Sequence, residues 1–578
     1  MTCNLKSHAF QTRPETRTCL PRKDMCCQPI SSYYIEKRCN IESVNITTSN
    51  LRLVSLPGTA IAAGGNYAKF YIGDFQSVTY SWAAMSTSFP MAIVRGAGVS
   101  VVTDGEFVID IPTGTTDFYL TVHMPTVNLI LITPENSPMI SFTDDEISMF
   151  MMLKYANKIA IDTSGLDHIS PILPDLRIQH QLGPHRSSRA MAIVHIAIMD
   201  ALIAIFGGFT PKVYTGSSPN ASPQAAIAQA LHDTLINLYP SHSTRLANIL
   251  TEMLNTIPNG NSKTSGIALG AASAAAIITD RIGDGSGLTE LYVGPGEYEP
   301  SGAFGEWTAP VGTVALGSQW GTYARPFTCP APPGTISFPL PPAFNSPEYA
   351  VAFNQVKAIG GNGTTTPTAR SPWETETGLY WAYDGTPSLC APPRLYNQVA
   401  VKVLSEHITT FMDFAKSLTL VNVSMADTAV YAWYWKYYFK IWRPTSAIQD
   451  PASSTTNPST PHDTTWTDYG APHPNAPNFV PPFPAYPSGH ASFGGSLFQV
   501  LRDEVGDVPF TFTSDELNGT IPGRPLAPRS FISLSQAEDE NGFSRIPLGI
   551  HFIFDKTAGI QLGQDVADEV IGNTYQPV

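Results

Sequence analysis

The sequence predicts a mostly helical protein with a small all-β segment near its N-terminus. From residue 143 onward, segments with apolar residues at helical spacing recur. Between residues 51 and 142, short β-branched and aromatic runs alternate with Gly, Asn, Asp and Pro, which is typical of strands and hairpins. A chain of 578 residues is also too long for one ordinary core. We predict a Cys-rich segment at 1–50, with disorder as an open alternative, a β-rich accessory domain at 51–142 and a helical domain at 143–578.

The helical part begins where the sequence changes character at Thr143. This residue is a suitable N-cap, and acidic residues follow it in the first predicted turn. Further helices are predicted at 187–206, 223–238, 241–256, 266–282, 347–359, 396–419, 425–442 and 491–505. Two proline-rich stretches, 330–344 and 471–487, cannot form regular helix. The second leads directly into Ser488, and we expect it to form a stiff support for the turn there.

Composition argues against nucleic acid as a partner. Acidic residues exceed basic ones by 47 − 33 = 14, which is typical of a soluble acidic protein and unfavourable for phosphate-backbone binding. The longest apolar stretch, 191–209, contains His195 and Asp200, so we expect a buried helix and no transmembrane segment. The oligomeric state is left open.

The N-terminal segment leaves the compartment open. Residues 1–23 lack the apolar core of a conventional signal peptide. Five of the seven cysteines lie within the first 39 residues, a pattern that favours disulfides over a metal site or a processed leader. An extracellular location therefore remains an option without a visible signal. Cys329 and Cys390 could pair, but two ordinary buried thiols are the expected state.

Three short segments near the C-terminus carry the chemistry of the chain. They are Lys436-x6-Arg443-Pro444, Pro487-Ser488-Gly489-His490 and Ser544-Arg545-x5-His551. Lysine, two arginines, a serine hydroxyl and a glycine N–H are hydrogen-bond donors suited to a tetrahedral oxyanion. The two histidines can ligate a metal, attack phosphorus or transfer protons near neutral pH. The combination predicts an oxyanion site, although each segment alone would be weak support.

The spacing of Lys436 and Arg443 suggests how two cations converge. Seven residues at 100° each bring both side chains within roughly 20° of one helix face. We therefore expect one helix to present both cations and to end at Pro444. The competing interpretation of Lys436 is an exposed surface lysine.

Ser488, Gly489 and His490 precede an apolar helical segment. We expect them at a helix N-terminus, where free N–H groups and the helix dipole favour anions. Ser488 could also serve only as the N-cap, and both roles are compatible.

The third segment contains a possible partner for its histidine. Pro547 is tolerated in a first helical turn, and Asp555 follows His551 by four residues. A carboxylate at this spacing can bind the second ring nitrogen and fix the tautomer. An ordinary surface acid is the alternative for Asp555.

These three segments resemble those of vanadium-dependent haloperoxidases, which share their site with the type-2 phosphatidic acid phosphatases. Four further stretches resemble the fungal vanadium chloroperoxidase type, and the likeness covers roughly residues 145–570. These stretches are PPFPAYPSGHASFGG, GLYWAYDGTP with APPRLYNQ, DELNG and GPHRSSRAMAIVHIAIMDA. The resemblance implies a domain of two four-helix bundles with the cofactor at the end of one bundle. Pro547 departs from the fungal pattern, in which a bulky apolar residue is usual.

The resemblance also implies roles for individual residues. Vanadate would be bound to Nε2 of His551, the metal ligand. Its oxygens would be held by Lys436, Arg443, Ser488, Gly489 and Arg545. His490 would be the acid–base residue that helps to deprotonate hydrogen peroxide. Lys436 would polarise the bound peroxide for attack by a halide, and the hypohalous acid formed would halogenate small organic acceptors.

Three further positions follow from the same resemblance. Asp384 matches the acid that pairs with the site arginine, here Arg545. Trp433 and Phe483 match the aromatic pair lining the chloroperoxidase site, whereas bromoperoxidases tend to have histidine at the second position. This makes chloride a plausible substrate, with bromide and iodide easier to oxidise, although simple packing would also explain both aromatics.

Two other functions stay open at this point. The same site could belong to an acid phosphatase, with His551 as nucleophile and His490 as general acid. Alternatively, the β-rich segment could be a non-enzymatic binding module attached to an inactive domain. The long resemblance and the aromatic pair favour the haloperoxidase.

Overall fold

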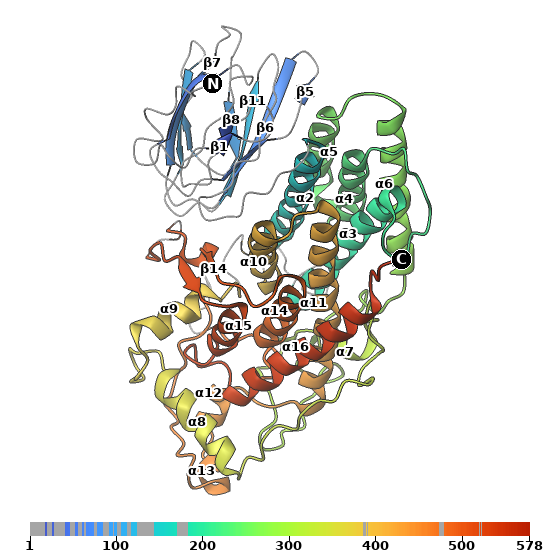
Figure 1. The fold of residues 1–578 in the computed structure, drawn as a ribbon. Coiled ribbons are helices and arrows are strands. Elements are labelled where there is room, and N and C mark those ends of the chain that lie inside the picture. Colours follow the sequence, from blue (N-terminus) through green and yellow to red (C-terminus); the bar gives the residue numbers. More distant parts are fainter. Residues whose placement is uncertain are drawn as a thin grey trace.

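The computed structural model describes residues 183–578 except 385–388, 390, 473–478, 520 and 522, together with one earlier helix and eleven strands. Helices dominate this part of the chain (Figure 1). The α-helices are α2 (Asp144–Ile169), α3 (Gly183–Phe206), α4 (Pro223–Leu238), α5 (Ser243–Asn255), α6 (Asn261–Asp280), α7 (Trp320–Tyr323), α8 (Pro347–Ile359), α9 (Pro372–Tyr380), α10 (Pro392–His407), α11 (Phe411–Phe439), α12 (Pro444–Gln449), α13 (Ala452–Thr456), α14 (Gly489–Val505), α15 (Leu534–Phe543) and α16 (Ile553–Asn573).

Strands within the helical part are short. β12 (Leu291–Tyr292) pairs with β13 (Val314–Ala315), and β14 (Phe510–Phe512) pairs with β15 (Arg529–Phe531), both antiparallel. Short 3-10 helices lie at Pro240–His242 and Asp515–Leu517. The mostly helical character predicted from the sequence is confirmed.

Strands also occur before residue 124, and all their pairings are antiparallel. They are β1 (Thr18–Cys19), β2 (Cys26–Cys27), β3 (Ile41–Ile46), β4 (Arg52–Ser55), β5 (Ala60–Ala62), β6 (Gly65–Gly73), β7 (Val78–Ala84), β8 (Ala92–Arg95), β9 (Gly98–Ser100), β10 (Glu106–Ile111) and β11 (Asp117–His123). One sheet has the order β3-β7-β10-β9, and another has β4-β6-β11-β8 with β5 beside β6. The side chains here lie outside the described residues, so the accessory domain and the N-terminal cysteine pairing stay predictions.

Local sequence explains where several helices begin. Ser222 caps α4 by accepting the N–H of Ala225, and Ser371 and Glu374 form a reciprocal capping box at α9. Each of these helices has proline in its first turn, where no intrahelical N–H is needed. The predicted helices at 223–238 and 347–359 are confirmed at both ends.

The predicted break between helices 396–419 and 425–442 was wrong. α11 runs without interruption through residues 419–424, and the real break lies at 408–410, before the N-cap Thr410. The sequence there is rich in Thr, Val and Asn, which have low helix propensity. Burial offsets this, because Thr419 and Asn422 donate to the carbonyls four residues earlier and Asn422 also bonds to Asn397.

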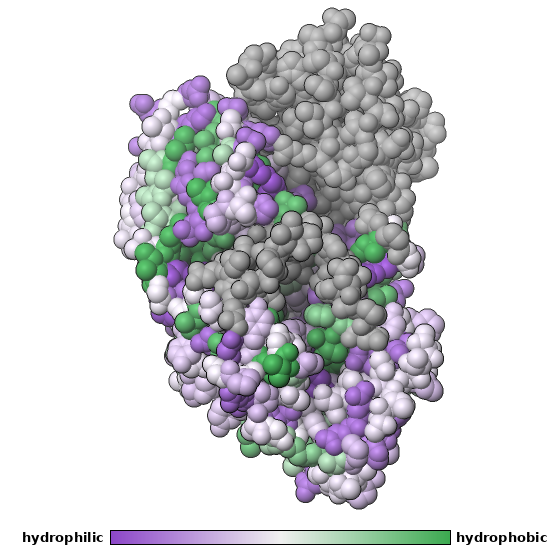
Figure 2. All heavy atoms as spheres, turned by 180° about the vertical axis from the view of Figure 1, so that it is seen from behind, coloured by the Kyte–Doolittle hydropathy of each residue, from purple (hydrophilic) through white to green (hydrophobic). Residues whose placement is uncertain are grey.

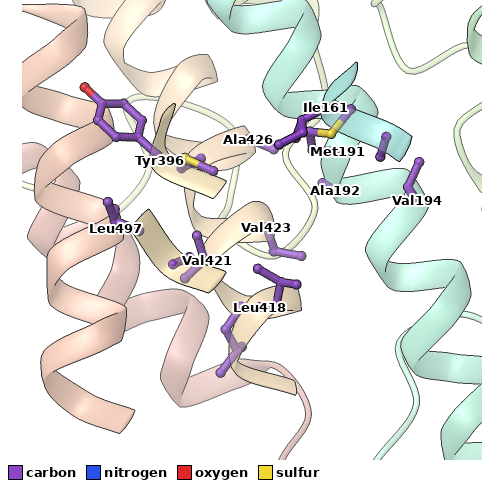
Figure 3. Close-up of a cluster of buried hydrophobic side chains, with 14 of the residues drawn as sticks. Ile161, Met191, Ala192, Val194, Tyr396, Leu418, Val421, Val423, Ala426 and Leu497 are labelled. Atoms are coloured by element: carbon purple, nitrogen blue, oxygen red, sulfur yellow. The ribbon is translucent and has the colours of Figure 1, made fainter. Parts of the chain in front are cut away.

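α11 lies at the centre of the core. It packs against α3 on one side and against α14 and α16 on another (Figure 1). Figure 3 shows Leu418, Val421 and Val423 of α11 in the middle, between Leu497 of α14 on one side and Met191 of α3 on the other. The division into two four-helix bundles stays a prediction.

α14 and α16 approach closely because small residues line their contact. A Cβ at Gly563 would lie 2.1 Å from the carbonyl oxygen of Ser492, and one at Gly559 would lie 2.8 Å from that of Ser488. The N–H of Ser488 also donates to the carbonyl of Asp555 at 3.0 Å. The start of α14 is therefore fixed against the start of α16.

α3 is long and apolar enough to span a membrane. However, 89% of its most apolar window is buried inside the structure, as expected for a core helix of a soluble protein. Figure 2 shows polar and apolar residues mixed over one face of the described part. Cys329 is a free, buried thiol, as expected, whereas Cys390 lies outside the described residues.

Candidate oxyanion site

Lys436 is buried in the last turn of α11 and faces the proline-rich segment. Its Nζ donates to the carbonyls of Pro484 at 2.8 Å, Ala485 at 3.1 Å and Pro487. Three acceptors match the three hydrogens of an ammonium group, so an anion would have to replace one of them. The segment is non-helical in its described residues, as predicted, and its role as a stiff support for the turn at Ser488 stays a prediction.

The expectation that Lys436 and Arg443 share one helix was wrong. α11 ends at Phe439, and Lys440 adopts a left-handed conformation with φ 53°. Arg443 follows in extended backbone as the N-cap of α12. The two cations still converge, because Lys436 Nζ and Arg443 Cζ lie 4.9 and 5.0 Å from the centre of the Phe483 ring.

Arg443 is held almost entirely by backbone oxygens. Its Nε donates to Phe483 O at 2.9 Å, Nη2 to Pro481 O at 3.2 Å and Nη1 to Ile550 O at 2.9 Å. Nη1 also lies 2.9 Å from Nε2 of His551. The guanidinium therefore connects the proline-rich segment to the loop that carries His551.

His551 lies between a cation and a carboxylate. Nδ1 is 2.8 Å from Asp555 Oδ2, the contact expected from the sequence, and the Arg443 contact leaves Nε2 as the hydrogen-bond acceptor. His551 itself precedes α16, so the contact arises at the helix start and not within a helix, and Pro547 lies in a turn. The tautomer with the proton on Nδ1 presents the Nε2 lone pair to the site.

Burial and neighbouring charges keep His551 neutral. Burial lowers the pKa of His551 well below its usual range, and Arg443 and Lys436 lower it further. Burial raises the pKa of Asp555 to about 7, while the N–H of Phe552 opposes this. Asp555 also accepts that N–H at 2.9 Å.

The turn before α14 supplies backbone donors. Ser488 is the N-cap of this helix, and its hydroxyl accepts from Ala491 N at 3.5 Å. The next N–H groups, of Gly489 and His490, lie in the first helical turn, where no intrahelical acceptor exists. A Cβ at Gly489 would meet only the Trp433 ring at 3.7 Å, so no contact within the protein requires glycine here.

His490, Asp384 and Arg545 form a second chain of contacts. Arg545 Nη2 forms an ion pair with Asp384, the expected pairing. His490 Nε2 lies 2.7 Å from the carbonyl of Ala382 and 3.8 Å from Asp384 Oδ1. Because a carbonyl can only accept, Nε2 carries the proton in neutral His490. Burial, followed by the positive charge of Arg545, lowers the pKa of His490 to about 4.

Arg545 has unused donors. Its side chain is 1% exposed, yet Nε and Nη1 have no hydrogen-bond partner among the described residues. Leaving a buried guanidinium donor unpaired costs about 1 to 3 kcal/mol or more. An oxyanion bound beside Arg545 would satisfy both donors.

Trp433 and Phe483, the aromatic pair, border the cations. Their ring centres lie 5.2 Å apart, and both rings are almost completely buried. Phe483 is in contact with both Lys436 and Arg443. The structure thus brings every site residue predicted from the sequence into one region, with hydrogen-bond donors and two neutral histidines bordered by apolar rings.

Sequence reasoning missed the backbone acceptors and several supporting side chains. The carbonyls that hold Lys436 and Arg443 could not be assigned without the fold. Tyr396, whose hydroxyl donates to the carbonyl of His490 at 3.0 Å, occurs in the stretch APPRLYNQ but received no role. The same is true of His185 in GPHRSSRAM, whose ring centre lies 5.1 Å from that of Trp433.

Comparison with known proteins gives consistent results. Residues 416–578 match a family described as the VCPO second helical-bundle domain. Vanadium chloroperoxidase from Curvularia inaequalis is 29% identical over 469 residues, which cover 65% of this chain and 75% of that protein. The structure is similar in fold to the first bacterial vanadium-dependent iodoperoxidase, with TM-score 0.57, 19% identity and coverage of 76% of this chain and 99% of that one. A holo-type bacterial vanadium-dependent chloroperoxidase gives TM-score 0.51 and 15% identity, covering 69% and 93%.

Proposed function

Since this chain is a relative of the vanadium-dependent haloperoxidases, we propose that it oxidises halide ions with hydrogen peroxide in a vanadate-dependent reaction. The product is hypohalous acid, which halogenates small organic acceptors. When bound, vanadate supplies a pentavalent Lewis acid that activates peroxide without changing oxidation state.

The main structural support for this proposal is that two donors of Arg545 have no partner among the described residues. A buried guanidinium whose Nε and Nη1 lack a hydrogen-bond partner in the described part of the chain suits a multiply charged oxyanion. Arg443 and Lys436 add positive charge, and Ser488 with the Gly489 N–H adds neutral donors. The donor set therefore fits vanadate.

The histidines take different roles because their partners differ. His551 directs an unprotonated Nε2 toward the cations, so it is the proposed metal ligand, with Asp555 fixing its tautomer. His490 is neutral near pH 7 and can accept a proton from incoming hydrogen peroxide. Asp384 orients Arg545 and lies near His490.

Lys436 is proposed to shift between two sets of acceptors. Its Nζ donates to three carbonyl oxygens, and an oxygen atom of a bound anion would replace one of them. The bound charge would raise the pKa of Lys436, which burial keeps well below the usual range. The ammonium could then polarise the activated oxygen that a halide attacks.

The aromatic pair suggests that the halide approaches an apolar surface. Trp433 and Phe483 exclude water beside the cations, which strengthens electrostatic interactions there. Chloride, bromide and iodide are all candidate substrates, and chloride is favoured by an aromatic residue at 483. A matched test is Phe483→His, which we expect to reduce chloride turnover more than bromide turnover.

An acid phosphatase is the second candidate function. The same donors fit phosphate, and His551 Nε2 is oriented as an unprotonated nucleophile. His490 would then donate a proton to the leaving group. The aromatic pair beside the cations favours halide oxidation.

One pair of assays separates the two functions. Purified protein is given vanadate, peroxide, a halide and a halogenation-sensitive dye, and separately p-nitrophenyl phosphate. We expect dye turnover that requires vanadate and is suppressed by excess phosphate. Phosphatase turnover without halide oxidation would overturn the proposal.

Two variants test whether the unpaired donors of Arg545 bind the oxyanion. Arg545→Met should weaken vanadate binding by about tenfold to a thousandfold, because a charge-assisted donor set is lost. Arg502→Met is the matched control, since Arg502 pairs with Glu538 at the far end of α14. Equal vanadate affinities in the two variants would contradict a role for Arg545.

The organisation around this site remains part of the proposal. We infer a catalytic domain at 143–578 with two four-helix bundles and an accessory all-β domain at 51–142. Assays on the purified protein test a binding role of the β segment and the nature of the organic acceptor, and fractionation of the source cells tests an extracellular location.

A further inference from the structure

A single backbone position, Leu316, connects the two members of the aromatic pair. Its carbonyl accepts from Trp433 Nε1 at 3.0 Å and from the Tyr437 hydroxyl at 2.9 Å. Its N–H donates to the carbonyl of Pro482 at 3.0 Å, immediately before Phe483. Leu316 therefore ties α11 to the proline-rich segment at the level of the two aromatic rings.

The next residue, Gly317, lies directly against the indole of Trp433. It has φ +74°, and an added Cβ would lie 2.1 Å from Trp433 Cδ1 and 2.2 Å from Nε1. Glycine is required here by both conformation and space. The position of this backbone thus determines how far the indole can move.

Glu290 holds Gly317 in place. Its Oε2 accepts the Gly317 N–H at 2.6 Å, and the carboxylate side chain is only 5% exposed. Oε1 accepts from Arg186 Nε at 3.1 Å and lies 3.2 Å from His185 Nε2. Burial alone would raise the pKa of Glu290, but these partners lower it to about 2, so the carboxylate is ionised.

Both partners of Glu290 are themselves fixed. Arg186 donates its terminal nitrogens to the carbonyls of Ser286 and Leu288 at 2.5 and 2.7 Å. The His185 ring is fully buried and contacts two indoles, edge-to-face with Trp320 at 4.8 Å between ring centres and tilted against Trp433 at 5.1 Å. The indole of Trp433 is consequently confined by the Leu316–Gly317 backbone and by His185.

We propose that Glu290, held by His185 and Arg186, is a positioning residue that sets the placement of Trp433 and Phe483 beside the oxyanion site. It contacts neither the cations nor the histidines of the site, and it acts through the backbone of Leu316 and Gly317. This assigns a role to the GPHRSSRAM stretch at the start of α3. The consequence for halide use rests on the proposed function.

The test compares Glu290→Ala, Glu290→Gln and the control Asp200→Ala. Asp200 is a buried carboxylate on α3 that accepts the N–H groups of residues 212–214, so its loss removes a similar number of hydrogen bonds elsewhere. Hydrogen exchange is measured for the peptide containing Gly317, which requires no activity. Halide KM, the bromide-to-chloride ratio of kcat/KM and vanadate affinity are measured on the full chain.

We expect Glu290→Ala to lose amide protection at Gly317 and to change halide kcat/KM by about tenfold to a hundredfold, as for a small displacement of site residues. Vanadate affinity should fall by less than halide kcat/KM, because Arg443 keeps its hydrogen bond to the Ile550 carbonyl and Arg545 keeps its ion pair with Asp384. Glu290→Gln should recover part of the protection, since its amide oxygen can accept the same N–H. Asp200→Ala should leave the halide ratio unchanged.

Different results overturn different statements. Unchanged exchange at Gly317 in Glu290→Ala would overturn the positioning role alone. Lost protection with unchanged halide kinetics, or a parallel loss of vanadate affinity, would overturn the link to the aromatic pair. A wild-type protein without halide turnover would overturn the proposed function and the halide consequence, whatever the exchange data show.

Discussion

His551 Nδ1 lies 2.8 Å from Oδ2 of Asp555, and this contact determines which ring nitrogen faces the oxyanion site. Asp555 is fully buried and also accepts the N–H of Phe552, so its position is set by the start of α16. Oδ1 has no hydrogen-bond partner among the described residues. Among the described residues, His551 is thus the only side chain to which the Asp555 carboxylate forms a hydrogen bond.

Asp555→Ala should weaken vanadate binding by about tenfold to a hundredfold, because outer partners of a metal-bound histidine contribute that much to affinity. Isothermal titration of the apo-protein with vanadate measures the effect. Asp565→Ala, a partly exposed position on the same helix that accepts from Gln561, should leave affinity unchanged. A wild-type affinity in Asp555→Ala would contradict the orienting role.

Anion binding should raise the pKa of His490. Burial and Arg545 lower this pKa to about 4, and a nearby negative charge favours the protonated imidazole. NMR titration of labelled histidine, with and without vanadate or phosphate, should show an upward shift that disappears in His490→Gln. A downward shift on loading would be incompatible with an anion near this ring.

Sequence reasoning identified the candidate site residues but did not predict the backbone conformation that brings them together. The helix start at Ser488 and the spacing of His551 and Asp555 are local features, so motif and capping rules were sufficient. The relation of Lys436 to Arg443 was not local, because it depends on a left-handed residue at Lys440 that no propensity rule indicated. Both cations meet at Phe483, which is contributed by a different segment.

The fold shows the same distinction between local and long-range information. Helices with Ser or Pro at their start, such as α4 and α8, were predicted at both ends. The continuity of α11 was missed, since burial and the Asn397–Asn422 pair override the low helix propensity of residues 419–424. Glu290 was not a candidate, because its role becomes visible only when Gly317 is placed against Trp433.

A buried histidine outside the site should make the protein less stable in acid. Burial lowers the pKa of His195 from about 6.5 to about 3, and Nε2 lies 3.1 Å from Asn157 Oδ1. Because the folded pKa lies below the unfolded value, stability is complete above about pH 6.5 and is lost as pH falls toward 3. Each pKa unit corresponds to about 1.4 kcal/mol, so the total is a few kcal/mol.

Urea unfolding of the apo-protein at pH 7.5 and pH 4.5 measures this dependence. His195→Gln retains a donor for Asn157 but cannot be protonated, so it should lose less stability between the two pH values than the wild type. The control is His462→Gln, which replaces an exposed histidine. This variant should lose as much stability between the two pH values as the wild type. Equal pH dependence in wild type and His195→Gln would rule out His195 as a source of acid sensitivity.

Close packing of α14 against α16 should be needed for both stability and vanadate binding. Gly563→Ala would place a Cβ 2.1 Å from the backbone oxygen of Ser492, so the helices must separate. We expect a loss of about 1 to 3 kcal/mol in the free energy of unfolding, as for other overpacked cores. Gly572→Ala on the same helix meets nothing within 4 Å and should be neutral or stabilising by up to about 1 kcal/mol.

These two alanine variants also test how the site is assembled. Ser488 is the N-cap of α14 and Asp555 belongs to α16, and the Ser488 N–H donates to the Asp555 carbonyl at 3.0 Å. Separation of the helices should therefore weaken vanadate binding in Gly563→Ala under conditions where the variant is still folded, whereas Gly572→Ala should bind normally. If Gly563→Ala were destabilised yet bound vanadate with wild-type affinity, the helix contact would support the fold without aligning the two halves of the oxyanion site.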